Sequence, residues 1–466
     1  MEATIEKIIS LCKRRGFIFP GSEIYGGFAN SWDYGPLGVE LKNNIKQAWW
    51  KRFVHNRADM IGIDAALVMN PKVWEASSHL KNFTDPLVEC KKCHHRFRAD
   101  TIGFPTSDSR KNGKNIKCPD CGGELTEARQ FNMMLKTFIG PAEDSANVAY
   151  FRPETAQAMF VDFKQVLETS RKRIPFGIAQ IGKAFRNEIT PGNFIFRTRE
   201  FEQMEIEYFI DKKDWKKKFE YWLKEMYAWM ESLGLSKKHI HDLEVPKEER
   251  AHYSERTVDI EYDFPFGKKE LYGIAYRTDF DLSNHQKASG EDLKYTDPVS
   301  GEKYVPHVIE PTFGVDRTVL AVLCEAYNEE QAPTAKKSSV IPDSEQGRGN
   351  HSGIQENETE TRIVLKFPKW LAPYKVAVLP LSKKPELSKV AYKIYEDLLT
   401  EFVCEYDETQ SIGKRYRRQD EIGTPYCVTV DFESLEDKAV TVRDRDTMKQ
   451  ERIKIGELKE VLKNKF

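Results

Sequence analysis

The chain has 466 residues, of which 40% are hydrophobic and 31% are charged. This composition supports buried cores and excludes a wholly disordered chain, and the length is that of about three ordinary domains. The 72 Lys and Arg residues nearly balance the 73 Asp and Glu residues, so a uniformly basic nucleic-acid coat is excluded and any nucleic-acid-binding surface must be local.

The N-terminal residues 1–15 are charged throughout and lack the apolar core of a signal peptide, and no run of 18 apolar residues occurs in the chain. We therefore expect a cytoplasmic protein with no membrane partner. Four of the eight cysteines form two C-x-x-C pairs, whereas the other four are scattered, as buried small hydrophobic residues usually are. In a reducing compartment such pairs indicate metal binding rather than disulfides.

The first predicted elements are a helix and a strand. Apolar residues recur every four positions over 36–53, and Pro36 suits the first position of a helix. Residues 64–70 alternate as a strand that stops at Pro71. Residues 86–130 differ in composition from the segments on either side, since they contain paired Cys, Lys and Gly-containing turns. This indicates a small inserted module.

Residues 176–185 and 200–209 alternate as two strands, and the turn signal Pro191-Gly192-Asn193 between them predicts a hairpin with a long, Arg-bearing loop. Strand parity places one aromatic ring, one amide and one carboxylate on a single face: Phe201, Gln203 and Glu205. Such a face can hold a planar base and a small charged ligand. The alternative is a half-exposed sheet whose charges face water.

Residues 211–260 are rich in Lys, Trp and Glu at helical spacing, which predicts a helical excursion. A strand over 307–310 and a helix over 314–327 follow. Arg317 falls in the first turn of that helix, where a cation opposes the helix macrodipole. A phosphate bound at the helix N-terminus would remove this conflict, and so would pairing of Arg317 with Asp316 or Glu310.

Residues 328–362 are polar and predict a flexible linker or insertion. Strands at 374–381 and 426–430, with a helix around 389–402 between them, predict a separate α/β domain with a parallel sheet. This domain carries a basic run, Lys414 to Arg418, with Tyr416 inside it. Phosphate contact and base stacking fit single-stranded RNA, and a solvated charged face is the alternative.

The paired cysteines have the spacing Cys90-x2-Cys93-x24-Cys118-x2-Cys121. Four thiolates in two paired knuckles predict a closed, tetrahedral and therefore structural Zn²⁺ site. His94 and His95 are rival ligands at the same place. The spacer of 24 residues is slightly longer than that of the usual zinc ribbon.

Three segments together resemble the motifs of class II aminoacyl-tRNA synthetases. The helix and strand over 36–71 are similar to motif 1, the hairpin with Arg186 and Glu188 to motif 2, and the strand, glycine and helix ending in Gly314-Val315-Asp316-Arg317 to motif 3. More narrowly, the chain resembles glycyl-tRNA synthetases of the homodimeric type from Ile24 to its C-terminus. That match rests on the runs Trp32 to Gly38, Arg152 to Gln157, Phe185 to Glu188 and Phe196 to Glu205.

The resemblance implies an α+β protein of three parts. The catalytic domain would comprise residues 1–85 and 131–327 around an antiparallel sheet, with a zinc-ribbon-like four-cysteine module inserted at 86–130. The linker 328–362 would lead to an anticodon-binding α/β domain at 363–466. The implied partners are ATP, glycine, tRNA(Gly) and a second copy of the chain, which would dimerise through the motif 1 region.

The resemblance also implies the site residues. Arg186 would hold the α-phosphate and Arg317 the γ-phosphate as the catalytic pair, Phe201 would stack on adenine, and Glu188 would accept from its amino group. Glu270 would bridge ATP and Mg²⁺. The full ATP set is Arg186, Asn187, Glu188, Phe196, Arg197, Thr198, Arg199, Glu200, Phe201, Glu270, Leu271, Gly314, Val315, Asp316 and Arg317. The glycine set is Arg98, Glu154, Phe201, Glu202, Gln203, Met204, Glu205, Glu310, Pro311, Thr312, Phe313 and Gly314.

Two other functions remain open on the sequence. The resemblance implies an ATP-dependent glycine–tRNA ligase. The alternatives are a synthetase for another small amino acid and a non-enzymatic RNA-binding factor on a degenerate synthetase fold. Intact Arg186, Glu188 and Arg317 favour an enzyme, because degenerate copies tend to lose their phosphate-binding residues.

Overall fold

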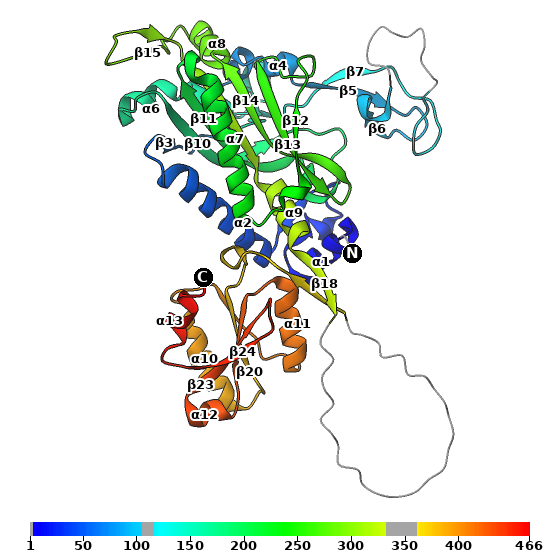
Figure 1. Cartoon of the computed structure of the whole chain (residues 1–466). Helices are drawn as coiled ribbons and strands as arrows, with labels where there is room; N and C mark the ends of the chain where they lie inside the picture. Colours follow the sequence, from blue (N-terminus) through cyan, green and yellow to red (C-terminus); the bar gives the residue numbers. More distant parts are fainter. Residues whose placement is uncertain (1–2, 105–115, 332–360) are drawn as a thin grey trace, which may run out of the picture. The chain divides into compact units, whose positions relative to one another are not determined.

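The computed structural model describes residues 3–104, 116–331 and 361–466 (Figure 1). The chain divides into two compact units, Gly16–Val322 and Met1–Arg15 with Leu323–Phe466. This division differs from the expected one, because the N-terminal 15 residues group with the C-terminal part instead of the catalytic part. Within the described residues, no helix is both long and apolar enough to cross a membrane.

The first unit is built on a seven-stranded sheet in the order β12-β13-β14-β17-β11-β10-β3. All neighbouring strands run antiparallel except β3 and β10, which are parallel. The predicted hairpin is confirmed, with Phe176 opposite Phe209 and Phe185 opposite Glu200. The strand bounds are β3 Met60–Gly62, β10 Phe176–Phe185, β11 Glu200–Ile210, β12 Ile240–Glu244, β13 Arg256–Phe264, β14 Gly267–Thr278 and β17 His307–Gly314.

The predicted long helix is confirmed as α2 (Pro36–Trp50), which continues into a π-helical turn over Lys51–His55. Its buried Trp49 and Phe53 pack on Phe313 of the sheet, with ring centroids 5.7 and 5.4 Å from that of Phe313. Gly62 of β3 lies close under this helix, since a Cβ atom there would lie 2.1 Å from Trp50.

The strand predicted over 64–70 is wrong for most of its length. The sheet strand is β3, and only Val68–Met69 (β4) forms a short strand later, paired with β9 (Val148–Phe151) and not with the main sheet. Between them the Ala65 carbonyl accepts a hydrogen bond from buried Arg152 at 2.9 Å, and Leu67 is exposed. The apolar alternation therefore did not reflect burial on one face of a sheet.

The helical excursion is confirmed only in its first half. Helix α7 (Trp215–Ser232) lies along the sheet in Figure 1 and buries an apolar stripe against β14 and β17. The second half of 211–260 contains β12 and the start of β13 in place of a second long helix. Alternate residues of β13, such as Val258, Ile260 and Tyr262, are buried, which is the pattern of a half-buried strand. The other helices of this unit are α3 Pro71–Ala76, α4 His79–Asn82, α5 Ala156–Val161, α6 Phe163–Ser170, α8 Phe280–Ser289 and α9 Val315–Ala326, which runs on into the second unit.

The insertion begins with β5 (Thr84–Glu89), which is central in a three-stranded antiparallel sheet with β6 (Arg96–Arg98) and β7 (Arg129–Asn132). Part of the predicted module, 105–115, lies outside the described residues. The remaining short strands of the first unit are β1 Ile18–Pro20, β2 Trp32–Tyr34, β8 Lys136–Phe138, β15 Tyr295–Thr296 and β16 Lys303–Tyr304.

The second unit contains a five-stranded sheet in the order β21-β20-β22-β23-β24. Its first three strands are parallel, but β23 and β24 are antiparallel, so the predicted parallel sheet is a mixed one. The bounds are β20 Val376–Pro380, β21 Cys404–Tyr406, β22 Tyr426–Val430, β23 Ala439–Asp444 and β24 Gln450–Lys454, with helices α1 Ile5–Arg15, α10 Pro385–Leu398, α11 Ile412–Ile422, α12 Glu433–Asp437 and α13 Leu458–Lys463.

The predicted linker 328–362 is partly structured at both ends. Strand β18 (Tyr327–Gln331) pairs antiparallel with β19 (Thr361–Leu365), so these ends form a ribbon instead of a free linker. The remainder of the predicted linker, 332–360, lies outside the described residues.

Candidate active site

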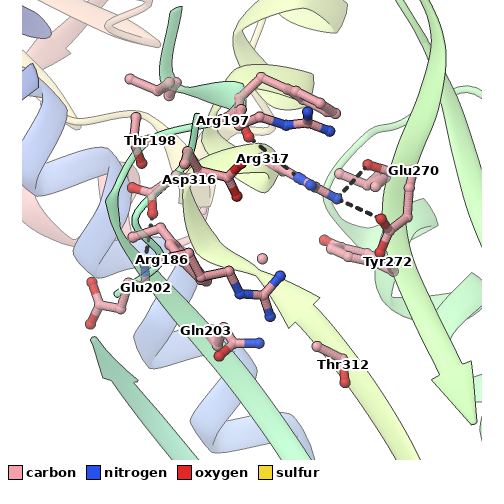
Figure 2. Close-up of a pocket in the computed structure, with 16 residues that line it drawn as sticks. Arg186, Arg197, Thr198, Glu202, Gln203, Glu270, Tyr272, Thr312, Asp316 and Arg317 are labelled. Atoms are coloured by element: carbon pink, nitrogen blue, oxygen red, sulfur yellow. Dashed lines mark hydrogen bonds and ion pairs between the residues drawn. The ribbon is translucent and has the colours of Figure 1, made fainter. Parts of the chain in front are cut away.

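One face of the seven-stranded sheet carries a cleft lined by the segment between β10 and β11, by residues of β11, β14 and β17, and by the first turn of α9 (Figure 2). Strand parity is as predicted: Phe201 and Gln203 line the cleft, and Glu205 lines its continuation. Arg186, Gln203, Glu270 and Thr312 line both parts, so the cleft and the pocket that holds Glu205 are continuous.

Arg186 follows β10 and reaches into the cleft. Its Nε donates to the Pro153 carbonyl at 3.0 Å, and its guanidinium lies 5.2 Å from the centroid of the Phe201 ring. Glu188, two residues on, is buried at the cleft wall, and its Oε2 has no hydrogen-bond partner within the described part of the chain. A cation, an aromatic face and an unsatisfied acceptor therefore meet at this end of the cleft.

Arg317 enters the cleft from the first turn of α9. Its Nη1 donates to both the carbonyl and the Oε2 of Glu270 at 3.0 Å, and its guanidinium lies 4.4 Å from the Phe196 ring (Figure 2). Neither Asp316 nor Glu310, the partners considered from the sequence, pairs with it. Because Glu270 is half exposed, this pair leaves Arg317 available to an anion in the cleft.

The Asp316 side chain points away from that of Arg317 and accepts hydrogen bonds from three other elements. Its Oδ1 accepts from the Tyr34 hydroxyl at 2.5 Å and from Lys42 Nζ at 3.2 Å, and its Oδ2 accepts from the Glu202 backbone N–H at 2.8 Å. The Glu202 carboxylate pairs with Lys42 and Lys46 of α2. These contacts fix the start of α9 against β11 and α2, and so they position Arg317.

The inner pocket is lined by three buried carboxylates from three segments: Glu154 before α5, Glu205 on β11 and Glu310 on β17. Glu205 accepts from Thr155 Oγ1 at 2.5 Å and from Thr312 Oγ1 at 3.0 Å. Arg277 Nη1 donates to Glu310 Oε1 at 2.6 Å. Such a pocket is suited to a small ligand that carries a positive charge.

The carboxyl groups of this pocket have shifted pKa values. Burial opposes ionisation of Glu154, but the neighbouring His79 and Arg277 hold its pKa below the usual range. Burial and the charge of Glu154 raise the pKa of Glu205. Burial raises the pKa of Glu310 to about 8, against the opposing effect of Arg277. The pocket therefore holds protons that a bound cation would displace.

Several residues of the predicted sets lie away from the pocket. Met204 and Phe313 are paired across β11 and β17 and are fully buried, and Phe313 packs on Trp49 of α2, so both are core residues on the opposite face. Arg98 pairs with Asp85 at 3.0 Å and Asp100 at 2.7 Å and does not line the cleft or the inner pocket.

The other predicted residues fall into three groups. Phe196, Arg197, Thr198, Leu271 and Gly314 line the cleft. Arg199 and Glu200 line an adjoining cavity toward α2, and Glu200 pairs with exposed Lys183. Asn187, Pro311 and Val315 line neither the cleft nor the inner pocket, because Val315 is in the core and Pro311 lies on the Phe313 side of β17.

Two charged residues, Arg277 and Asp259, are among those of the site that the sequence did not indicate. Arg277 is 1% exposed and bridges Glu310 to Asp281, to which its Nε donates at 2.7 Å. An Arg in an apolar strand with an Asp four residues later was the available signal. Asp259 on β13 faces Glu270, and burial together with the charge of Glu270 raises its pKa to about 7. No local signal distinguishes Asp259 from other strand acids.

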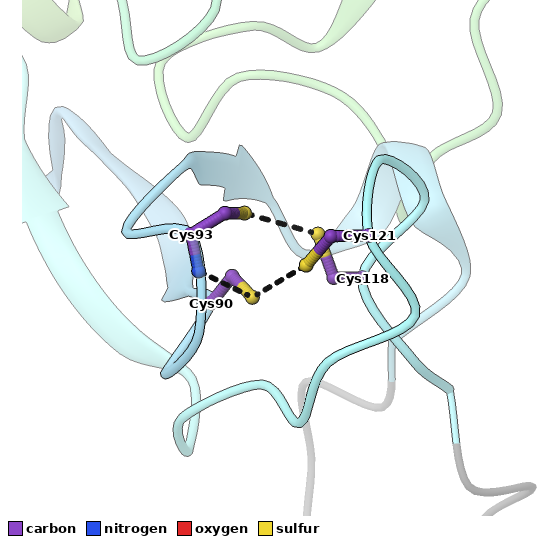
Figure 3. A group of neighbouring side chains, drawn as sticks. All are labelled: Cys90, Cys93, Cys118 and Cys121. Carbon is purple, nitrogen blue, oxygen red and sulfur yellow. Dashed lines mark hydrogen bonds between the residues drawn. The ribbon is translucent and has the colours of Figure 1, made fainter.

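The four paired cysteines come together as predicted (Figure 3). Their sulfur atoms lie within 4.8 Å of one another, and Cys90–Cys121 and Cys93–Cys118 are 3.5 and 3.6 Å apart. Four sulfurs bound to one Zn²⁺ lie about 3.8 Å apart, given a Zn–S distance of about 2.3 Å. His94 and His95 pair instead with Glu89 and Asp120, so the cysteines form the better ligand set.

Most side chains of the basic run in the second unit make contacts within their own fold, so only part of the predicted RNA-binding run is exposed. Arg415 is 1% exposed and donates to the carbonyls of Pro380, Leu381 and Asp407. Arg418 pairs with Asp407. The Tyr416 hydroxyl bonds to Thr429 on β22. Only Lys414 and Arg417 of this run are exposed.

Comparisons with known proteins agree with this geometry. Residues 141–327 match the family described as tRNA synthetase class II core domain (G, H, P, S and T), and residues 375–465 match the family described as anticodon binding domain. A glycine–tRNA ligase of Acetivibrio thermocellus is 54% identical, covering 100% of this chain and 99% of the relative. One from Geobacillus thermodenitrificans is also 54% identical, covering 100% and 98%.

Among solved structures, the prolyl-tRNA synthetase of Cryptosporidium parvum complexed with halofuginone and AMPPNP is similar, with a TM-score of 0.62. The likeness covers 99% of this chain and 77% of that chain at 15% identity. At that identity the likeness concerns the fold alone.

Proposed function

Because this chain belongs to the glycine–tRNA ligase family of class II aminoacyl-tRNA synthetases, we propose that its cleft and inner pocket perform the two steps of that reaction. The glycine carboxylate attacks the α-phosphorus of ATP and pyrophosphate leaves. The 3′-terminal ribose hydroxyl of tRNA(Gly) then attacks the glycyl carbonyl and AMP leaves. The observation that carries the proposal is the inner pocket of three carboxylates that opens directly into the arginine-lined cleft.

Both steps develop negative charge, so the chain's contribution is positioning and electrostatic stabilisation. Arg186 is the α-phosphate ligand in this proposal, and Arg317, beside Glu270, is the γ-phosphate ligand. Phe201 offers a face for adenine, and the unsatisfied Oε2 of Glu188 supports its role as acceptor for the adenine amino group. The glycine carboxylate needs no general base, since it is already an adequate nucleophile.

Recognition of glycine depends on charge and on size. Glu154, Glu205 and Glu310 together suit the substrate ammonium, while Thr312 and Tyr253 narrow the same pocket. A closely packed pocket rejects a larger amino acid by steric overlap, which is a stronger discrimination than that achieved against a smaller one. The residues Arg98, Met204 and Phe313 are not part of this proposal, because they lie away from the pocket.

Two metal ions are part of the proposal. Mg²⁺ would be held by Glu270 with Asp259, whose facing carboxylates carry like charge that a divalent cation relieves, and it would neutralise charge on the ATP phosphates. Zn²⁺ would be held by Cys90, Cys93, Cys118 and Cys121, whose sulfur spacing fits a tetrahedral ion. Four protein ligands leave no open position, so this Zn²⁺ would be structural.

We also propose that the chain forms a homodimer and acts in the cytoplasm. Ile24 and Tyr25 are 88% exposed and Phe28 is 80% exposed, just before α2. Three large apolar side chains exposed close together support burial against a second copy through the motif 1 region. Ile24→Asp with Phe28→Asp should convert a dimer into a monomer in analytical ultracentrifugation, and a wild-type monomer at micromolar concentration would contradict this interface.

The function is tested by aminoacylation of a tRNA(Gly) transcript with radiolabelled glycine. We expect the wild type to charge glycine, and Glu205→Gln to lose charging because the substrate ammonium loses a buried partner. Glu168→Gln, on the exposed surface of α6, is the matched control and should charge normally. Charging of alanine or serine at the rate of glycine would contradict the assignment of the pocket.

A further inference from the structure

Glu207 lies deeper on β11 than the glycine pocket and has no role in the reaction described above. It is fully buried, and neither of its carboxylate oxygens has a hydrogen-bond partner among the described residues. Strand parity places it on the same face as Gln203 and Glu205. A buried, unsatisfied carboxylate is costly, so its presence here requires an explanation.

The surroundings of Glu207 are mostly acidic. One carboxylate oxygen each of Glu205, Glu207 and Glu310 lie within 4.8 Å of one another. The β11–β17 register, with Glu205 opposite Thr312 and Tyr208 opposite Ile309, brings Glu207 opposite Glu310. Arg277 on β14 and Asp281 on α8 are the other charged groups that act on it, and Arg277 is already bonded to both Glu310 and Asp281.

A single guanidinium cannot neutralise this many carboxylates in a buried space. Burial and the charge of Glu310 raise the pKa of Glu207 well above its usual range, and Arg277 only partly opposes this effect. A neutral Glu207 removes one of the repelling charges and gains a hydroxyl that can donate. The carboxylates of Glu205 and Glu310, each with an oxygen within 4.8 Å of one of Glu207, can accept from that hydroxyl.

We propose that Glu207 is a positioning residue that acts as a neutral acid, donating a hydrogen bond to the Glu310 carboxylate and so holding it in place for the glycine ammonium. This inference rests on the proposed function. Arg277 orients Glu310 from β14, and Glu207 orients it from β11. Once the substrate ammonium has displaced the proton of Glu310, this residue presents one negative charge to the substrate without a second negative charge behind it.

Two substitutions distinguish a neutral, hydrogen-bond-donating Glu207 from a Glu207 that acts as an anion or only fills space. Glu207→Gln keeps the shape, the neutral state and a donor, so the KM for glycine in ATP–pyrophosphate exchange should stay within about threefold of the wild-type value. Glu207→Met keeps the approximate volume but has no donor, so the KM for glycine should rise roughly tenfold or more while the KM for ATP is unchanged. Glu168→Gln serves as the control for both.

A spectroscopic measurement tests the neutral state directly. The infrared difference spectrum of the wild type minus Glu207→Gln at neutral pH should contain the carbonyl band of a protonated carboxylic acid. A carboxylate band in its place, or a Glu207→Gln variant whose KM for glycine rises as much as that of Glu207→Met, would overturn the proposal. If Glu207→Met does not fold, the infrared band and the KM for glycine of Glu207→Gln relative to the wild type decide the question: a carboxylate band, or a rise in that KM of roughly tenfold or more, overturns the proposal. Loss of glycine-dependent exchange in the wild type and in Glu168→Gln is a different result, which would contradict the proposed function itself.

Discussion

Arg186 and Arg317 approach the cleft from two different elements, and each is held by contacts that leave its guanidinium facing the cavity. Arg186→Ala should lower glycine-dependent pyrophosphate exchange roughly 100- to 1000-fold, because a donor to charge that develops in the transition state is lost. The circular dichroism spectrum should be unchanged. Arg173→Ala, at an exposed position outside the cleft, is the control and should exchange normally. Near-normal exchange by Arg186→Ala would contradict its assignment.

The buried carboxyls predict how stability depends on pH. Glu205, Glu207 and Glu310 have raised pKa values, and that of Glu310 is about 8. Above pH 4.5, the ordinary pKa of a glutamate, these carboxyls lose their protons in the unfolded chain but keep them in the folded chain. Their stabilisation is complete below the unfolded pKa and is lost as the pH rises through the folded pKa. The melting temperature of the ligand-free protein should therefore fall as the pH rises from about 4.5 to about 8.

Glu310→Gln provides the comparison for this pH dependence, because the amide has no proton to lose. Its melting temperature should vary less over the same pH range, as followed by differential scanning calorimetry. A wild-type melting temperature that is constant or rises with pH would contradict the assignment of protons to this pocket.

At the scale of single residues, the sequence predicted the facing set Phe201, Gln203 and Glu205, because strand parity is a local property. It did not separate residues on the two faces of the returning strand β17, where Glu310 and Thr312 face the pocket and Phe313 faces α2. It could not identify Glu207 as unusual, because an unsatisfied carboxylate is visible only once the neighbouring strand is in place.

At the scale of elements, the group of four paired cysteines is the clearest local prediction that the structure bears out. Freshly purified protein should contain about one Zn²⁺ per chain by elemental analysis, bound by thiolates. Chelation should increase hydrogen exchange in β5, β6 and β7 while leaving the central strands β11 and β17 protected, because the core of the main sheet lies elsewhere. Protein without zinc and with freely titratable Cys90 and Cys118 would contradict the site.

Helix α11 gives a prediction in the second unit. Arg415→Met should destabilise this unit by about 2–4 kcal/mol, because three carbonyls, those of Pro380 and Asp407 in buried hydrogen bonds, lose their donor. Lys414→Met, next to it but exposed, should change the free energy of unfolding very little. Urea denaturation followed by circular dichroism measures both variants. Equal stability of the two would show that Arg415 is not a structural residue.

This helix also shows where reasoning from elements fails. A run of basic residues with one aromatic residue is typical of an RNA-binding surface and is equally compatible with a helix that packs one face on a sheet. The helical period points Arg415 into the fold, and only the positions of the Pro380, Leu381 and Asp407 carbonyls show what it binds. The strand predicted over 64–70 fails similarly, because its alternation was not matched by a partner strand.

At the scale of the whole molecule, the order of the motifs predicted an α+β core followed by an α/β domain, and the family matches over 141–327 and 375–465 agree with that order. The grouping of Met1–Arg15 with the C-terminal part was not predictable. It depends on contacts between positions far apart in sequence, such as Lys7 with Glu329 and Arg15 with Glu421.

In the proposed function, one continuous cleft joins the ATP site to a pocket selective for glycine. The most direct test is amino-acid-dependent exchange of labelled pyrophosphate into ATP by the full chain, measured with glycine, alanine, serine and proline in parallel. We predict exchange with glycine and, because larger side chains overlap the pocket wall, little or none with the other three. Exchange that depends on another amino acid, or none with glycine in a folded and metal-loaded protein, would contradict the account.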